Sequence, residues 1–293
     1  MTQPAVSVCV PAYNAERFLA ATVRSVLAQT FDDFELLVLD NASTDATPEI
    51  LRGFTDPRLR VVRNADVLGV AANWNRAVAN SAAPLVKLVC ADDLLHPRCL
   101  ELQHAVLTAD PGLALVCSRR DLINEQARLM ARNRGLRGLL GRHGNRAVIR
   151  KIVRHGGNPL GEPAGAMFRR EHFDAVRGFD GRWRFPLDLA LWIRLLEHGD
   201  FYGQRESLAA FRIGRGSLSA RAQRAEYVEQ RSLSDGIATA PLWTVPRRDR
   251  LVGAAKAPGA RLRRQALFLV ARRQAERGGF AAPRGRSGFG GER

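Results

Sequence analysis

Two adjacent aspartates, Asp92 and Asp93, end the apolar part of the segment VKLVCADDLLHP, residues 86–97. Like charges this close repel each other, and burial makes ionised carboxylates more costly. Two interpretations follow: the aspartates lie in a solvated loop that caps the next helix, or a cation lies between them and another anionic group. Mg²⁺ commonly binds one or two protein carboxylates together with phosphate oxygens. The second interpretation therefore predicts a site for a metal ion.

Polar residues also follow three other apolar segments. The segments at 6–10, 34–40, 59–62 and 84–90 are typical of strands, and helical patterns lie between them. Strands that alternate with helices predict an α/β fold with a mostly parallel sheet covered on both faces. Ligands of such sheets bind beyond the carboxyl ends of the strands. The polar residues at these ends are Tyr13 and Asn14, Asp40 and Asn41, Arg63 and Asn64, and Asp92 and Asp93. We predict that they form one site.

The second half of the chain is less regular. Residues 145–156 have helical apolar spacing, and so does a segment that begins near Asp188. Between them, 157–170 is a Gly/Pro-rich loop that leads into a short strand, and 207–219 is typical of a closing strand and loop.

Composition narrows the class of protein. The apolar fraction of 46% and the charged fraction of 25% are those of an ordinary globular protein. No apolar run is long enough to cross a bilayer, and the segment MTQPAVSVCVPAYN lacks the pattern of a secretory signal. The cysteines form no CxxC pair. We expect reduced thiols in a cytoplasmic protein, and neither a zinc-ligand set nor a disulfide framework.

The positive charge is concentrated at the end of the chain. Residues 247–293 contain 13 Lys/Arg and 3 Asp/Glu, a net charge of +10 out of +16. The Gly- and Arg-rich end is typical of disorder. Within this tail, 260–277 has an apolar stretch flanked by arginines, which fits a surface helix or an interfacial helix on anionic lipid. No basic platform interleaved with aromatic residues is present, so we expect no nucleic-acid partner.

Five segments in order resemble one enzyme family. The opening, VSVCVPAYNAERFLAATVRSVLAQTFDDFELLVLDNASTDAT, is similar to that of family 2 glycosyltransferases with the GT-A fold. The segments ADDLLHP, GEPAGAMFRR, GFDGRWRFPLDLALWIRLLEHGD and LAAFRIGRGSLS follow in the family's order, so the resemblance covers about 4–220. It implies transfer of a sugar from a nucleotide-diphosphate donor to an acceptor hydroxyl, with inversion at the anomeric carbon.

The resemblance also implies roles for individual residues. Pro11, Tyr13 and Asn14 would border the nucleotide base, and Asp40 would accept a hydrogen bond from it. The neighbouring strand-end and helix residues predicted to border the nucleotide sugar are Asn41, Arg63, Asn73, Asp93 and Arg212.

Two aspartates have the central roles in this assignment. Asp92 falls at the metal-binding aspartate of the family's DxD motif, which predicts Mg²⁺ or Mn²⁺ as cofactor. A divalent cation held by oxygen ligands stabilises a departing diphosphate. Asp188 falls at the catalytic base, which takes the proton of the acceptor hydroxyl.

The sequence departs from the family at two positions. Cys90 replaces the first aspartate of DxD, and Gly214 stands where relatives often have histidine. The first departure keeps a second class of function open: a catalytically degenerate binding protein, or a basic membrane-associated module.

Other interpretations of single residues also stay open. Asp40 could be a turn former, Asn73 could cap a helix, and Arg212 could pair with a surface acid instead of the diphosphate. Asp188 could be only a helix cap.

We predict three regions: a transferase domain at 1–220, a connecting segment at 221–246, and the tail at 247–293. The donor half of the domain would end near 118 and the acceptor half would follow. The expected partners are a nucleotide sugar and a glycan or lipid-linked acceptor of bacterial cell-surface synthesis. The expected location is the cytoplasm, at the inner face of the membrane if the tail binds anionic lipid.

Overall fold

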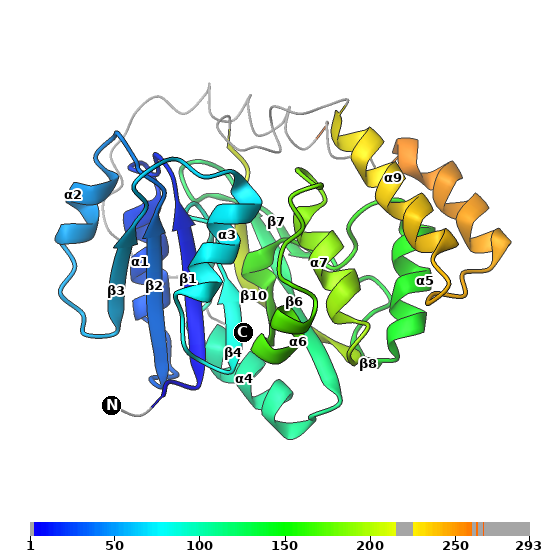
Figure 1. The fold of residues 1–293 in the computed structure, drawn as a ribbon, viewed down its shortest axis with the longest axis horizontal. Helices are drawn as coiled ribbons and strands as arrows, with labels where there is room; N and C mark the ends of the chain where they lie inside the picture. The colour runs from blue at the N-terminus through cyan, green and yellow to red at the C-terminus, as the bar shows by residue number, and fades with distance from the viewer. Residues whose placement is uncertain (1–2, 215–224, 260–261, 263–265, 267–293) are drawn as a thin grey trace.

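A ten-stranded sheet with helices on both faces forms the centre of the computed structural model (Figure 1). The structure describes residues 3–214, 225–259, 262 and 266. Its strands are β1 (Val6–Ala12), β2 (Phe34–Asp40), β3 (Leu59–Arg63), β4 (Leu85–Leu88), β5 (Leu94–Leu95), β6 (Leu113–Ile123), β7 (Leu129–Arg134), β8 (Gly141–His143), β9 (Ala166–Arg169) and β10 (Asp200–Arg212). Its α-helices include α1 (Leu19–Leu27), α2 (Thr47–Arg52), α3 (Val70–Ala79), α4 (Cys99–Ala109), α5 (Asn145–His155), α6 (Arg170–Ala175), α7 (Leu187–Leu195) and α9 (Ala225–Thr239). A short 3₁₀ turn, η1, covers Pro163–Gly165.

The sheet has a parallel part and an antiparallel part. The strand order is β3-β2-β1-β4-β9-β6-β10-β5, with β7 paired to β6 and β8 paired to β10. Strands β1 to β4 are mutually parallel, as their alternation with helices predicts. Strand β9 lies antiparallel between β4 and β6, so the sheet as a whole is mixed. The α/β prediction is confirmed, and the parallel arrangement holds for the first half.

Apolar side chains fill both faces of the sheet. Strand β1 is buried along its whole length, which explains its unbroken apolar sequence. On one face, Val23 of α1, Leu51 of α2 and Leu100 of α4 pack against the strands. On the other face, Val78 of α3 and Trp192 of α7 join the second core cluster. The two layers of helices hold the carboxyl ends of β1 to β4 at one edge.

The folded part of the chain continues past residue 246. Residues 247–259 form a helix, drawn in orange beside α9 and α5 (Figure 1). Its Asp249 is fully buried and forms ion pairs with Arg150 and Arg154 of α5. The start of the predicted tail is therefore an ordered helix that packs on the domain. Residues 215–224 and almost all of 260–293 lie outside the described residues, and the domain boundaries stay predictions.

None of the described helices combines the length and the apolar character that crossing a bilayer requires.

Candidate active site

The ends of three parallel strands meet in register. Ala12 of β1 lies opposite Asp40 of β2, and Asp40 lies opposite Arg63 of β3. Strand β4 lies on the other side of β1, with Cys9 opposite Leu88, and the residues after Leu88 continue to the same edge. The four strand ends that the sequence predicts to form one site are therefore neighbours.

Asp40 organises the loop that follows β2. It is almost fully buried, and it forms an ion pair with Arg63. Its Oδ1 accepts a hydrogen bond of 3.0 Å from the Ser43 backbone amide. Arg63 Nη2 donates to the Ser43 carbonyl at 2.9 Å. Asp40 therefore stabilises the turn that follows β2, as one interpretation of the sequence predicts, and it also lies at the end of that strand. Its contact with a nucleotide base stays a prediction.

The loop after β1 is attached to the same turn. Asn14 has a φ of 46°, a left-handed conformation that asparagine tolerates better than most residues. Its backbone amide donates to Ser43 Oγ at 3.0 Å, and its Oδ1 accepts from the Thr44 amide at 2.9 Å. Tyr13 beside it is 52% exposed, whereas Pro11 is buried within β1. An exposed aromatic ring on a well-held loop is suited to contact with a base.

Three buried asparagines join the neighbouring strand ends to α3. Asn64 Nδ2 donates to Asn41 Oδ1 at 2.7 Å and to Asn73 Oδ1 at 3.0 Å. The predicted alternative for Asn73, a helix cap, is wrong. Helix α3 begins at Val70, its N-cap is Gly69, and Asn73 lies one turn inside. Because Asn73 is not at the N-cap, its side chain can join the hydrogen-bond network with Asn64.

The acidic turn after β4 gathers three groups that could hold a metal ion. Ligand atoms of Cys90, Asp92 and Asp93 all lie within 4.8 Å of one another. The Asp93 amide donates to the Cys90 carbonyl at 3.0 Å, which closes the turn. From α1, Thr22 Oγ1 lies 2.9 Å from the Ala91 carbonyl and 2.8 Å from the Asp93 carbonyl.

Asp93 has one carboxylate oxygen that no donor of the described residues reaches. The side chain is fully buried, and its Oδ1 accepts a 3.0 Å hydrogen bond from the Arg212 amide. Among the described residues, no donor reaches its Oδ2. A buried oxygen without a donor is costly unless a ligand or ion meets it. The interpretation of these aspartates as a solvated loop therefore does not hold for Asp93.

Burial changes the protonation of the whole turn. It raises the pKa of Asp93 well above its usual range, and the charge of Asp92 raises it further. Burial also raises the pKa of Asp92, while the charge of Arg212 lowers it. The pKa of Cys90 is raised by burial and then by the surrounding carboxylates. A bound cation would favour the ionised forms of these groups, and hard oxygen ligands suit Mg²⁺ or Mn²⁺.

Arg212 holds this turn from the end of β10. Its Nε donates to the Asp92 carbonyl at 2.7 Å, and its Nη1 donates to the carbonyls of Asn124 and Glu125 at 3.1 and 3.2 Å. The guanidinium also lies over the ring of Phe18, 4.5 Å from its centre. The Arg212 guanidinium thus donates to three backbone carbonyls. Its predicted contact with the diphosphate stays a prediction.

Asp188 lies in the first turn of α7. Its Oδ2 accepts a hydrogen bond of 3.1 Å from Asn158 Nδ2, and its Oδ1 accepts one of 2.7 Å from the Leu189 amide. The N-cap of the helix is Pro186, so Asp188 is not the N-cap residue, although its Oδ1 accepts from a first-turn amide; its role as the base stays a prediction. Its charge contributes to raising the pKa of Cys90, so it lies within electrostatic range of the acidic turn. The carboxylate is oriented from two sides.

A second charged pair was missed by the sequence analysis. Arg120 of β6 forms an ion pair with Glu162, whose Oε1 accepts from Arg120 Nη2 at 3.1 Å. The charge of Glu162 also raises the pKa of both Asp93 and Cys90, so the pair flanks the acidic turn. Gly161, with φ of 105°, leaves room for the guanidinium, because a Cβ there would lie 2.8 Å from Arg120 Nη1.

A buried lysine supports the turn that carries Glu162. Lys87, in the middle of β4, donates from Nζ to Gln103 Oε1 at 2.8 Å and to the carbonyls of Ala164 and Ala166 at 2.6 and 3.1 Å. Its burial lowers its pKa, and its three acceptors satisfy all three ammonium donors. A lysine within the apolar run VKLVC was the only sequence signal of this support.

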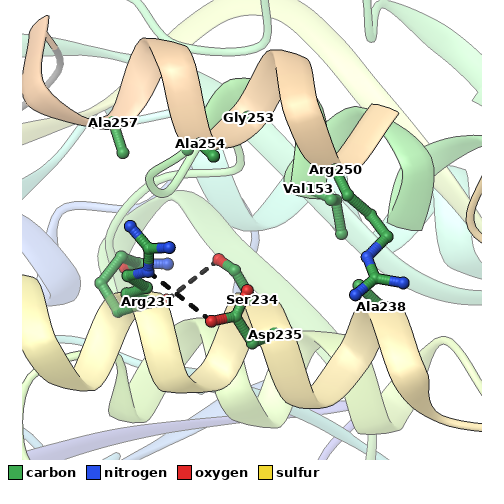
Figure 2. Close-up of a pocket in the computed structure, with 11 residues that line it drawn as sticks. Val153, Arg231, Ser234, Asp235, Ala238, Arg250, Gly253, Ala254 and Ala257 are labelled. Carbon is green, nitrogen blue, oxygen red and sulfur yellow. Dashed lines mark hydrogen bonds and ion pairs between the residues drawn. The ribbon is translucent and has the colours of Figure 1, made fainter. Parts of the chain in front are cut away.

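A hollow of about 40 Å³ lies away from these residues (Figure 2). It is lined by α5, α9 and the helix at 247–259, including Arg231, Ser234 and Arg250. None of the predicted site residues lines it. We therefore place the candidate active site at the strand ends.

Comparison with protein families gives a match over most of the domain. The family described as "Glycosyl transferase family 2" matches residues 7–177. Uncharacterized protein MT1568 of Mycobacterium tuberculosis is 30% identical over 200 residues, which is 66% of this chain and 62% of that protein. The putative glycosyltransferase EpsE of Bacillus subtilis is 27% identical over 72% of this chain and 73% of its own length.

A third relative is named for a reaction on a lipid-linked sugar. It is the UDP-Glc:alpha-D-GlcNAc-diphosphoundecaprenol beta-1,3-glucosyltransferase WfgD of Escherichia coli, 30% identical over 42% of this chain and 48% of its own length. The matches to MT1568 and WfgD thus span less than two thirds of those proteins.

Solved structures confirm the predicted fold class. S. aureus TarS 1-349 in complex with UDP has a TM-score of 0.63 at 16% identity, over 86% of this chain and 70% of that one. The mannosyltransferase PcManGT from Pyrobaculum calidifontis, in complex with GDP-Man and Mn²⁺, has a TM-score of 0.62 at 20% identity, over 96% and 77%. These likenesses show that the chain has the GT-A fold.

Proposed function

The chain belongs to glycosyltransferase family 2, and we propose that it transfers a sugar from a nucleotide-diphosphate donor to a hydroxyl of a lipid-linked glycan, with inversion. The single observation that carries this proposal is the acidic turn at the strand ends. There Asp92 and Asp93 follow β4, the strand that pairs with β1, whose end carries the exposed Tyr13, and the charge of Asp188 acts on Cys90 of the same turn. This arrangement has a place for a diphosphate and a base for the acceptor.

Asp92 and Asp93 would hold a divalent cation. The fit rests on Oδ2 of the fully buried Asp93, which has no donor among the described residues, and on the oxygen donors that Mg²⁺ and Mn²⁺ prefer. When bound, such an ion offsets the negative charge that develops on a departing diphosphate. Arg212 would keep both aspartates in place through its contacts with the Asp92 carbonyl and the Asp93 carboxylate.

The donor nucleotide would lie on the loops after β1 and β2. Tyr13 would contact the base, and the hydrogen bonds between Asn14 and the 43–44 turn would hold that loop in position. Asp40 would accept a hydrogen bond from the base through a carboxylate that Arg63 already orients. Pro11, Asn41 and Asn73 would shape the floor of this half.

Asp188 would act as the general base. Asn158 and the Leu189 amide each donate to one of its oxygens, so its orientation is restricted before the acceptor binds. The carboxylate would take the proton of the acceptor hydroxyl while the new glycosidic bond forms. A positioned base of this kind contributes about 10²–10⁴-fold to the rate.

The acceptor would be anionic. Residues 126–161 contain nine Lys/Arg and no Asp or Glu, and Arg128, Arg132, Arg134 and Arg137 within them are exposed. Strand β7 carries part of this segment beside β6, with Arg134 opposite Arg120. A lipid diphosphate near these arginines would present its sugar toward the acidic turn. The relative WfgD is named for a substrate of this chemistry.

The test is a donor screen followed by a transfer assay. UDP- and GDP-sugars are compared by thermal shift with and without Mn²⁺. The best donor is then incubated with a soluble sugar and with a lipid-diphosphate sugar, and the anomeric configuration of the product is read by NMR. We expect metal-dependent donor binding and an inverted product, formed faster with the diphosphate acceptor. Donor binding without transfer to either acceptor would favour a catalytically degenerate binding protein.

A further inference from the structure

Cys90 differs from the other three cysteines in its surroundings. Cys9, Cys99 and Cys117 are buried among apolar side chains of the core, at 0–1% exposure. Cys90 follows β4 at the sheet edge and is partly exposed. Its Sγ lies within 4.8 Å of an oxygen of Asp92 and of Asp93. Two ligand atoms of one tetrahedral zinc ion lie about 3.5 Å apart, so these three side chains need shifts of about 1 Å to share an ion.

A second observation points to a ligand at the same place. Asp93 is fully buried, and its Oδ2 has no hydrogen-bond donor among the described residues, although its Oδ1 is bonded to the Arg212 amide. A buried oxygen that lacks a donor is accounted for by a cation within the cluster. This observation is independent of the thiol.

We propose that Cys90 Sγ is a direct ligand of the cation, and that the resulting sulfur–oxygen donor set selects Co²⁺ and Zn²⁺ over Mg²⁺. The inference rests on the proposed metal-dependent function and adds the identity of the ion. Thiolate is a soft ligand that favours zinc-like ions, whereas Mg²⁺ requires hard oxygen ligands in nearly ideal octahedral geometry. On binding, a metal–sulfur bond forms and the thiol proton passes to water, so no oxidant or reductant is needed.

Co²⁺ titration of the full chain tests the ligand assignment by spectroscopy. A cobalt–thiolate bond gives a near-ultraviolet charge-transfer band that oxygen ligands do not give. We expect this band in the wild type, its loss in Cys90→Ser, and its retention in the control Cys99→Ser, where a hydroxyl can keep the buried hydrogen bond to Gln103. A wild-type chain that binds Co²⁺ without the band, or a Cys90→Ser chain that keeps it, would overturn the proposal.

Calorimetry with the metal ions alone tests the selectivity. Cys90→Ser should weaken Co²⁺ and Zn²⁺ binding by about tenfold or more, since loss of even an outer partner of a metal ligand typically costs that much. Cys90→Asp should restore a hard donor and raise the affinity for Mg²⁺ relative to Zn²⁺. Equal Mg²⁺ and Zn²⁺ affinities in the wild type, unchanged in both variants, would contradict the proposal.

The same titrations separate this inference from the proposed function. If the wild type binds Mn²⁺ together with UDP but shows no sulfur band with Co²⁺, the thiol assignment is wrong and the metal-dependent function stands. If no ion binds with or without UDP or GDP, the metal site itself is wrong and both proposals lose their basis. As a further readout, bound Zn²⁺ should slow alkylation of Cys90, the partly exposed thiol, by iodoacetamide.

Discussion

The backbone amide of Arg212 donates a 3.0 Å hydrogen bond to Oδ1 of Asp93, joining the end of β10 to the acidic turn after β4. The Arg212 side chain adds a 2.7 Å bond to the Asp92 carbonyl, so one residue holds both aspartates. The second half of the domain thereby shapes a turn that belongs to the first half.

Replacing Arg212 by alanine should destabilise this turn. The variant keeps the amide bond to Asp93 but loses the guanidinium bonds to the carbonyls of Asp92, Asn124 and Glu125, and leaves those acceptors unsatisfied, which should lower the free energy of unfolding by about 3 kcal/mol. Urea unfolding measures the change. Arg52→Ala is the control, because Arg52 forms an exposed ion pair with Glu49, and its loss should cost about 1 kcal/mol or less. Equal effects of the two substitutions would show that Arg212 is not a support of the site.

Asp92→Asn should weaken metal and donor binding without unfolding the protein. The exchange keeps the shape but removes a charge that meets the cation, so the Kd for Mn²⁺ with a nucleoside diphosphate should rise about 10–100-fold. The melting temperature of the metal-free protein should stay the same or rise slightly, because burial raises the pKa of Asp92 and its ionised form is already unfavourable. Calorimetry gives the Kd values. Asp66→Asn, an exposed exchange after β3, is the control, and wild-type affinity in Asp92→Asn would refute the metal assignment.

Asp188→Asn should separate chemistry from binding. Asparagine keeps the hydrogen bonds that a carbonyl oxygen can accept but cannot take a proton at neutral pH, so kcat should fall by about 10²–10⁴-fold. The donor Kd should remain near that of the wild type. The control is Asp174→Asn, on the exposed side of α6. Transfer within a few-fold of the wild type would require another base, and Glu162 would be the first to examine.

Two truncations should distinguish the folded helix from the rest of the tail. A chain that ends after residue 259 should keep its melting temperature and its transfer to a soluble acceptor. A chain that ends at Pro246 loses Asp249, the buried partner of Arg150 and Arg154, and should melt lower. Binding to vesicles that contain anionic lipid tests the membrane role. The chain that ends after residue 259 should lose its salt-sensitive binding to these vesicles. Unchanged vesicle binding after removal of 260–293 would exclude this role.

The stability of the protein should fall between about pH 7 and pH 5. Burial lowers the pKa of His172, as do the stacked His198 and Arg169, while Glu171 opposes them. The folded state therefore binds fewer protons than the unfolded state, so stability is present above the ordinary histidine pKa of about 6.5 and is lost as the pH falls toward the folded pKa. Urea midpoints measured across this range should follow the fall. His172→Phe keeps the stacking and should flatten the curve; an unchanged slope would mean that His104, whose pKa burial also lowers, dominates.

The residues missed by the sequence analysis share a physical reason. Lys87 and Arg120 act through contacts with segments 42–77 residues away in sequence. Neither periodicity nor a local motif records such a contact. Lys87 stood out only as a charge in an apolar run, and Arg120 is one of two adjacent arginines in β6.

The sequence by itself determined the elements and the residues at their ends. Apolar periodicity and the alternation of strands with helices are local properties, so they placed β1 to β4 and put Asp40, Arg63, Asp92 and Asp93 at strand ends. Tertiary structure alone decided which of these residues meet and in what state. The antiparallel insertion of β9, the bond from Arg212 to Asp93 and the unpartnered Asp93 Oδ2 all depend on how distant segments pack, because burial and hydrogen-bond partners are set only when the whole sheet closes.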